Sequence, residues 1–265
     1  MSKALLPFSD QRTADSPSRT AWQNLLFLLP WLCLYELAIG WLATGWRSGA
    51  DLWLRTCLNA LPGEPGWLVP CLIPVGLLFQ QIVQRQSWSN SAKCQSAMFM
   101  ESVIAASGLL VAGSVWTFFL PGNHPLFLGS SQPVVPVAAH LAIAYLGAGL
   151  YEEILFRGGL LTFVMLLLAT MRLPGQGALT IAIGLSSLVF ALAHSVTPME
   201  LTDATVWADA IYQLLVNPTA WPLFLFRLFA GIYFAVLYWY RGLGVAIIAH
   251  AGYDIVVGVC LQEPL

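Results

Sequence analysis

The stretch YEEILFR, from Tyr151 to Arg157, decides the fold and the chemistry of this chain. It places two adjacent carboxylates, Glu152 and Glu153, and an arginine at the end of an apolar run that is otherwise fit to cross a membrane. An ionised side chain inside a bilayer costs at least about 2.5 kcal/mol, so such residues are rare there and mostly functional. The stretch therefore predicts a functional site within a membrane-spanning helix.

Two later apolar segments carry titratable residues in a similar way. One is FALAH, from Phe190 to His194, and the other is HAGYD, from His250 to Asp254. Helix bundles commonly build their sites from side chains on facing helices. We therefore expect the three segments to face one another and to form one buried acid/base site.

The composition predicts an all-α fold, a polytopic transmembrane helix bundle. The chain has 265 residues, of which 58% are hydrophobic and 9% charged, and its mean hydropathy is +0.74. Soluble domains carry about 25% charged residues. The net charge of −2 and the lack of a basic stripe argue against a nucleic acid partner. The five cysteines are scattered without CxxC spacing, which indicates neither a disulfide framework nor a thiolate metal site.

The pattern of apolar runs predicts a short tail followed by one membrane domain. Residues 1–20 are a polar N-terminal tail, and residues 21–265 are a single transmembrane helical domain of about eight helices with short interfacial helices. We find no internal repeat. The expected spans are 22–45, 67–84, 97–120, 135–156, 178–196, 223–240 and 245–260, and short interfacial helices are expected within 46–66 and 197–220.

The apolar segment 158–171 leaves the number of spans open. It is short, so it forms either a short span or a helix that crosses only part of the bilayer. If it crosses, the acidic connection 197–220 lies on the cytoplasmic side. If it does not cross, Arg172 and Arg241 lie there instead, which the excess of Lys and Arg in cytoplasmic loops favours.

Several charged residues in the predicted spans have structural explanations as well as functional ones. Glu36 is an intramembrane acid and a functional candidate, but it can also pair with a neighbouring helix, for example with Arg227. Arg227 either extends to the interface or pairs with an acid. Glu101 falls in the first turn of its expected span, where the helix dipole favours a carboxylate. We expect His124, in a loop, and His140 to be structural.

Spacing within each motif predicts which side chains share a helix face. Glu153 and Arg157 are four residues apart, so they can form an ion pair, while Glu152 is rotated away by about 100°. His250 and Asp254 are also four apart, and so are Phe190 and His194. One carboxylate can therefore be held by the arginine while its neighbour is free to act as a general acid or base.

The three motifs together resemble the CPBP family, which comprises the type II CAAX prenyl endopeptidases and their Abi-family relatives, described as glutamic intramembrane proteases. The family pattern is Glu-Glu-x-x-x-Arg, then Phe-x-x-x-His, then His-x-x-x-Asn or Asp. Here these are Glu152-Glu153 with Arg157, Phe190 with His194, and His250 with Asp254, in the same order. The resemblance covers a protease-like core at about residues 135–260, and it favours the arrangement in which 158–171 crosses.

The resemblance implies hydrolysis of a peptide bond inside the membrane. Glu152 would activate water, His194 would position or polarise that water, and His250 with Asp254 would stabilise the oxyanion. Glu153 and Arg157 would orient Glu152 and the helix end. The CAAX enzyme typically has Asn at the position of Asp254, and an ionised aspartate cannot donate to an oxyanion, so Asp254 is either protonated or acts through His250.

That departure favours a bacterial relative in the plasma (inner) membrane with another substrate. The expected partners are the lipid bilayer and a protein or peptide substrate, such as a lipidated one or a sorting or leader signal. No cofactor is expected. The alternative is a zinc protease with Glu152, His194 and His250 as ligands, although no HExxH motif is present. A proton-coupled carrier or a non-catalytic membrane scaffold are the other open classes.

Overall fold

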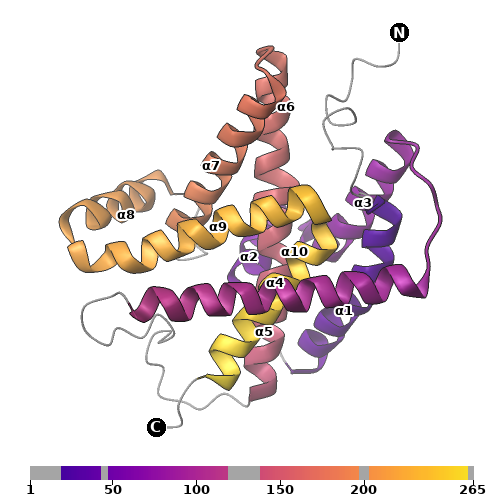
Figure 1. Ribbon diagram of the computed structural model, residues 1–265, viewed down its shortest axis with the longest axis horizontal. Helices are drawn as coiled ribbons and strands as arrows, with labels where there is room; N and C mark the ends of the chain where they lie inside the picture. The colour runs from indigo at the N-terminus through magenta and orange to yellow at the C-terminus, as the bar shows by residue number, and fades with distance from the viewer. Residues whose placement is uncertain (1–18, 43–46, 119–137, 197–202, 262–265) are drawn as a thin grey trace.

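The computed structural model describes residues 19–42, 47–118, 138–196 and 203–261, and every regular element in these ranges is a helix. The predicted all-α bundle is therefore confirmed (Figure 1). The α-helices are α1 (Ala21–Leu42), α2 (Gly49–Asn59), α3 (Leu72–Val83), α4 (Ala92–Phe118), α5 (Ala138–Glu153), α6 (Thr162–Thr170), α7 (Gly175–Ala193), α8 (Ala204–Val216), α9 (Trp221–Arg241) and α10 (Leu243–Ile255).

Four shorter helical pieces join or extend these elements. The 3₁₀ segments are η2 (Pro65–Cys71), which leads into α3, and η5 (Pro218–Ala220), which leads into α9. The π-helical segments are η3 (Ile154–Leu161), between α5 and α6, and η6 (Val256–Cys260), which follows α10. A π-helix is rare and often marks a functional site, and η3 begins directly after the Glu-Glu pair.

Seven helices within the described ranges are long and apolar enough to cross a membrane. One of them runs without a break from Ala138 to Thr170, so 158–171 continues the preceding span instead of forming a short or partial span of its own. The Thr162 hydroxyl donates to the Arg157 carbonyl at 3.1 Å, which helps to satisfy the backbone where the π-helix passes through Gly158 and Gly159. The helix therefore continues past residue 156, where the expected span ended.

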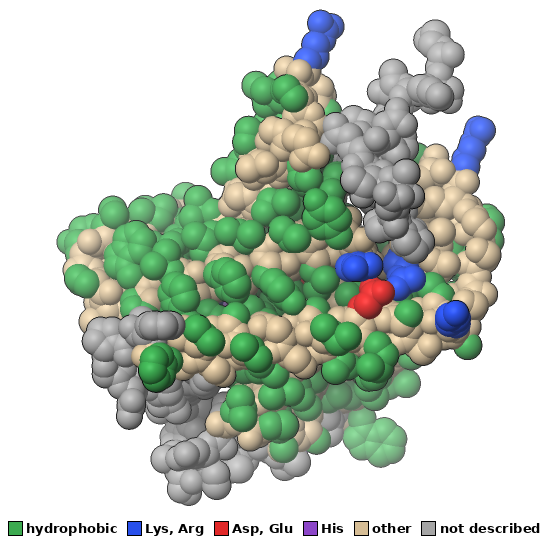
Figure 2. Space-filling model, viewed as in Figure 1, with side chains coloured by type: hydrophobic (Ala, Val, Ile, Leu, Met, Phe, Trp, Pro, Cys, Tyr) green, Lys and Arg blue, Asp and Glu red, His purple; other side chains and the backbone are tan. Residues whose placement is uncertain are grey.

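Apolar side chains are spread over the whole visible surface, whereas Lys and Arg are sparse and lie at its upper and right edges and beside an acidic side chain to the right of centre (Figure 2). Large hydrophobic side chains remain exposed on nearly every predicted span, which suits contact with lipid. Length, composition and this surface identify an integral, multi-pass membrane protein. Short helices, α2 and α8, occupy both stretches in which interfacial helices were expected.

Helix α10 lies at the centre of the bundle, between α5, α4 and α9 (Figure 1). Its residues from Leu243 to Ala251 are all buried. Small residues in this helix, including Gly244, Ala246 and Ala249, allow the neighbouring backbones to approach closely, as is common in membrane helix packing. The centre of the fold is therefore the helix that carries His250 and Asp254.

The predicted start of the third span needs correction, and two predicted segments lie outside the described ranges. The third span begins earlier than predicted, because the Ser91 hydroxyl accepts from the Cys94 amide and caps α4. Glu101 therefore lies in the interior of α4, where it pairs with Arg19 at 2.7 Å, and is not a first-turn residue. The tail 1–18 and the loop 119–137, which contains His124, lie outside the described residues.

Candidate active site

Helices α5 and α10 approach each other so closely that no side chain fits between them at Gly149. A Cβ at this position would lie 2.8 Å from the Ala251 Cβ and 2.9 Å from the Ile247 carbonyl oxygen. Glu153 follows one helical turn after Gly149, on the same face of α5. The contact therefore places Glu153 directly against the turn of α10 that holds His250.

Glu153 is fully buried and joins two of the predicted site residues. Its Oε1 atom lies 2.9 Å from Arg157 Nη1 and 2.9 Å from His250 Nδ1. The predicted ion pair between Glu153 and Arg157 is therefore present. An ionised carboxylate only accepts, so the contact with His250 fixes the Nδ1 proton on the imidazole and turns Nε2 toward the rest of the site.

Arg157 is also fully buried, in the π-helical segment, and reaches across to α9. Its Nη2 donates to the Gly231 carbonyl at 2.9 Å. The guanidinium lies over the rings of Phe190 at 4.5 Å and Phe234 at 5.8 Å. These cation–π contacts help to hold a charge away from water.

The ring of Phe234 also stacks on the imidazole of His250, with centroids 4.5 Å apart. Phe190 packs edge-on against His194 at 4.5 Å, as the sequence spacing predicted. The two phenylalanines thus form an apolar wall that joins both histidines and Arg157. Phe190 comes from the predicted motif, whereas Phe234 comes from α9.

Glu152 points to both histidines but bonds to neither. Its Oε2 atom lies 3.7 Å from His194 Nε2 and 4.0 Å from His250 Nε2. This oxygen is buried and has no hydrogen-bond partner among the described residues, although 18% of the whole side chain is exposed. The structure therefore brings one carboxylate and two imidazole nitrogens to one point from α5, α7 and α10.

The remaining contacts of the two histidines define their orientation. His194 caps the end of α7, and its Nδ1 lies 2.8 Å from the Phe190 carbonyl oxygen, which can only accept. Nδ1 therefore carries a proton, and Nε2 of the neutral ring offers a lone pair toward Glu152. On the other side, Asp254 Oδ2 lies 3.3 Å from His250 Nε2, which joins Asp254 to the site through the imidazole.

A cavity of about 180 Å³ lies beside this cluster, between the end of α7, α8 and the start of α9. Ser195 and Arg227 line it, together with Asp209 and Gln213. Arg227 Nη1 donates to the His194 carbonyl at 3.4 Å, so the cavity wall and the histidine are in direct contact. The cavity therefore reaches the backbone of His194 through Arg227.

The proposed zinc ligands are only partly arranged for a metal. The distances of Glu152 Oε2 to His194 and His250 are close to the spacing of donors around a tetrahedral ion, but His250 Nε2 is also engaged by Asp254. Among the described residues no group of three His, Cys, Asp or Glu side chains is arranged to hold a metal ion. Whether this chain uses zinc stays a prediction for experiment.

The structure corrects one expectation about pairing. Glu36 does not pair with Arg227; it contacts Arg55 and the Tyr151 hydroxyl, because α2 places Arg55 beside α1. Arg227 instead donates to a backbone carbonyl. The described contacts of Glu153 are with Arg157 and His250, and its expected role in orienting Glu152 stays a prediction.

Sequence reasoning missed three contributors to the site: Gly149, Gly231 and Phe234. The two glycines mark close helix contacts, since a Cβ at Gly231 would lie 3.1 Å from Ser187 Cβ and 3.2 Å from the Phe190 ring. A glycine one turn before Glu153 in an apolar helix is a usable signal for such a contact. The sequence contains no comparable signal for Phe234, because aromatic residues occur throughout α9.

Comparison with known proteins agrees with the geometry. Residues 134–256 match the family described as type II CAAX prenyl endopeptidase Rce1-like, a range that contains all three motifs. Neither a curated protein nor a solved structure matches the chain significantly. The match covers slightly less than half of this membrane protein, and it supports the resemblance to the CPBP family that the three motifs carry.

Proposed function

We propose that the chain is a glutamic intramembrane endopeptidase, in which Glu152 activates the water that hydrolyses a peptide bond of a membrane-associated protein or peptide. The observation that carries the proposal is the position of the Glu152 Oε2 atom. It is buried, has no hydrogen-bond partner among the described residues and lies within 4.0 Å of both imidazole Nε2 atoms.

Separations of 3.7 and 4.0 Å are too long for direct hydrogen bonds but suit a single shared water molecule. Such a water can donate one proton to Glu152 and the other to the Nε2 lone pair of neutral His194. Its own lone pair is then free to attack a carbonyl carbon, and Glu152 takes up the proton that the water loses. His194 in this arrangement positions the nucleophile.

The other half of the site is suited to stabilise the oxyanion. A doubly protonated His250 donates from Nδ1 to Glu153 and presents Nε2–H toward Asp254 and the reacting carbonyl. Asp254 can therefore contribute through His250 without donating a hydrogen bond itself. The Arg157–Glu153 ion pair keeps the ring in this orientation, and the cavity beside Ser195 offers a route for the substrate.

The direct test compares Glu152→Gln with the parent chain in membranes, by mass spectrometry of proteins that change length. General base catalysis contributes about 10² to 10⁴-fold, so we expect precursors to accumulate uncleaved while the protein itself is present at its normal level. Glu101→Gln is the matched control, because Glu101 is a paired carboxylate in a different helix. Equal product profiles for the parent and Glu152→Gln would refute the proposal.

The same comparison identifies the substrate class. A prenylated protein with a CAAX ending would accumulate in its unprocessed form if this chain shares the substrate named for its family. The aspartate at position 254 leads us to expect a different membrane-associated substrate, such as a leader or sorting segment. Purified protein with the accumulated precursor in detergent then shows whether the chain alone cleaves it.

A further inference from the structure

Helix α5 has a second tightly packed face, opposite the site, which meets α1 and α2. Tyr151, the residue before Glu152, is fully buried there, and its hydroxyl lies 2.6 Å from Glu36 Oε1. One turn earlier on the same face, a Cβ at Gly147 would overlap the ring of Tyr35. The rings of Tyr35 and Tyr151 meet edge-on at 5.6 Å. Helices α1 and α2 therefore fix the position of α5 at Tyr151, the residue next to the candidate general base Glu152.

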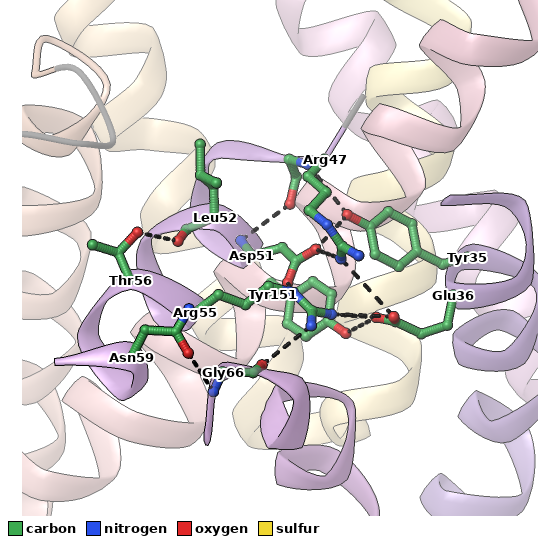
Figure 3. A network of polar contacts seen from close by, with 11 residues as sticks. Tyr35, Glu36, Arg47, Asp51, Leu52, Arg55, Thr56, Asn59, Gly66 and Tyr151 are labelled. Atoms are coloured by element: carbon green, nitrogen blue, oxygen red, sulfur yellow. Dashed lines mark hydrogen bonds and ion pairs between the residues drawn. The ribbon is translucent and has the colours of Figure 1, made fainter. Parts of the chain in front are cut away.

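Two guanidinium groups hold the Glu36 carboxylate in place: Arg55, in α2, and Arg47, just before α2 (Figure 3). Arg55 Nη2 lies 3.1 Å from each carboxylate oxygen of Glu36, and Arg47 Nη1 lies 4.0 Å from Oε2. Two hydrogen bonds from one guanidinium nitrogen, together with the tyrosine hydroxyl, restrict the direction in which the carboxylate points. Glu36 thus connects α2 to Tyr151.

Arg55 is fixed in turn by the fully buried Asp51. Its Nε lies 2.6 Å from Asp51 Oδ1, and its Nη1 donates to the Gly66 carbonyl at 3.1 Å. Asp51 Oδ2 accepts from Arg47 at 2.7 Å and from the Tyr35 hydroxyl at 2.9 Å. Burial alone would lower the pKa of Arg55, but the Asp51 carboxylate raises it above its ordinary value, so this guanidinium stays charged.

The helix geometry connects this network to the direction of the Glu152 side chain. Gly147 and Tyr151 are one turn apart and face α1, while Gly149 and Glu153 are one turn apart and face α10. Successive residues are rotated by about 100°, so Glu152 lies between the two packed faces. After Glu153 the α-helical hydrogen-bond pattern gives way to η3, so the contacts that set the rotation of α5 at Glu152 precede this segment.

We infer that Glu36, held by Arg55 and bonded to Tyr151, is a positioning residue that sets the rotation of α5 and thereby aims Glu152 at His194 and His250. The catalytic part of this inference rests on the proposed function. The residues of the network other than Tyr151 lie outside the matched range 134–256. They add to the site a support that comes from the first helices of this chain.

The test removes one hydroxyl by Tyr151→Phe and compares it with Tyr233→Phe. Tyr233 is a matched control, because its hydroxyl also makes one interhelical hydrogen bond, to the Ala105 carbonyl at 2.8 Å, but joins α9 to α4. The first readout needs no catalysis: the rate of disulfide formation between Glu152→Cys and His194→Cys in a chain without its five native cysteines. We expect Tyr151→Phe to slow it several-fold and Tyr233→Phe to leave it unchanged.

The second readout is cleavage of the precursor that the comparison of Glu152→Gln with the parent chain identifies. Because a misplacement of 1 Å can cost about 10²-fold in rate, we expect Tyr151→Phe to lower kcat by about 10-fold or more, with KM nearly unchanged. Glu36→Gln keeps an acceptor for Tyr151 but weakens the contact with Arg55, so its kcat should lie between those of Tyr151→Phe and the parent.

The outcomes separate this inference from the proposed function. If Tyr151→Phe forms the disulfide and cleaves as Tyr233→Phe does, the positioning role is wrong even though the protein is a protease. If the parent chain cleaves nothing, the proposed function is wrong, and the rate of disulfide formation alone decides whether Tyr151 sets the position of residue 152.

Discussion

Gly149→Ala is the sharpest perturbation that the structure offers, because it adds one methyl group where α5 and α10 touch. The new Cβ would lie 2.8 Å from Ala251 Cβ and from the Ala251 amide nitrogen. Carbon atoms in ordinary contact are about 3.5 to 4.0 Å apart, so the helices must separate by about 1 Å. The obstacle is mostly backbone, which cannot turn aside as a flexible side chain would.

A separation of this size would act directly on the candidate site. The hydrogen bond between Glu153 and His250, now 2.9 Å, would lengthen beyond hydrogen-bonding range. The distance from Glu152 Oε2 to His250 Nε2, now 4.0 Å, would grow by a similar amount, which moves the His250 imidazole away from a water held by Glu152 and His194. We expect the cleavage rate to fall by about 10 to 10²-fold. Overpacking should cost about 1 to 3 kcal/mol of stability.

Gly184→Ala in α7 is the control, because a Cβ there would meet nothing within 4 Å. Replacing glycine by alanine within a helix stabilises by up to about 1 kcal/mol, and both variants share this gain. The difference between them in thermal unfolding and in cleavage of the identified precursor therefore isolates the contact between α5 and α10. If the two variants unfold and cleave alike, the close approach at Gly149 does not hold the site together.

Three further predictions concern the buried ion pair, the ring stacked on His250 and the metal requirement of the site. Arg157→Met should lower the stability by about 3 to 5 kcal/mol, because it leaves Glu153 buried without its cation, and adding Glu153→Gln should restore much of this loss in thermal unfolding. Phe234→Leu removes the ring stacked on His250 and should cost about 1 kcal/mol of stability together with a several-fold lower cleavage rate. Incubation with a strong zinc chelator, followed by its removal, should leave cleavage by the purified protein unchanged, whereas loss of activity that zinc restores would support the metal alternative.

Local helix geometry explains which parts of the site could be predicted from the sequence. The pairs Glu153 with Arg157, Phe190 with His194 and His250 with Asp254 are each four residues apart, and the structure shows all three contacts. They depend only on the helical repeat. That the three motifs meet was expected from a shared pattern and could not be derived from any one segment.

The parts that could not be predicted depend on contacts between distant helices. Arg55 and Arg227 were equally available in sequence as partners of Glu36, and only the position of α2 beside α1 selects Arg55. Likewise, the expected span ended at residue 156, but a π-helical segment continues the helix to Thr170. Hydropathy predicts neither feature, because one is a contact between two helices and the other is a change of hydrogen-bond pattern within a helix.

The buried ion pair of Arg157 and Glu153 is better explained by orientation of His250 than by stability. Such pairs are often no more stabilising than apolar side chains of the same size, because both charges lose their water. This one is also incompletely bonded, since Arg157 Nε and Glu153 Oε2 have no hydrogen-bond partner among the described residues. An apolar pair would leave His250 Nδ1 without its acceptor, and Nε2 would then have no fixed direction. The ion pair of Arg157 and Glu153 therefore orients the His250 imidazole toward Glu152, as the proposed proton transfer requires.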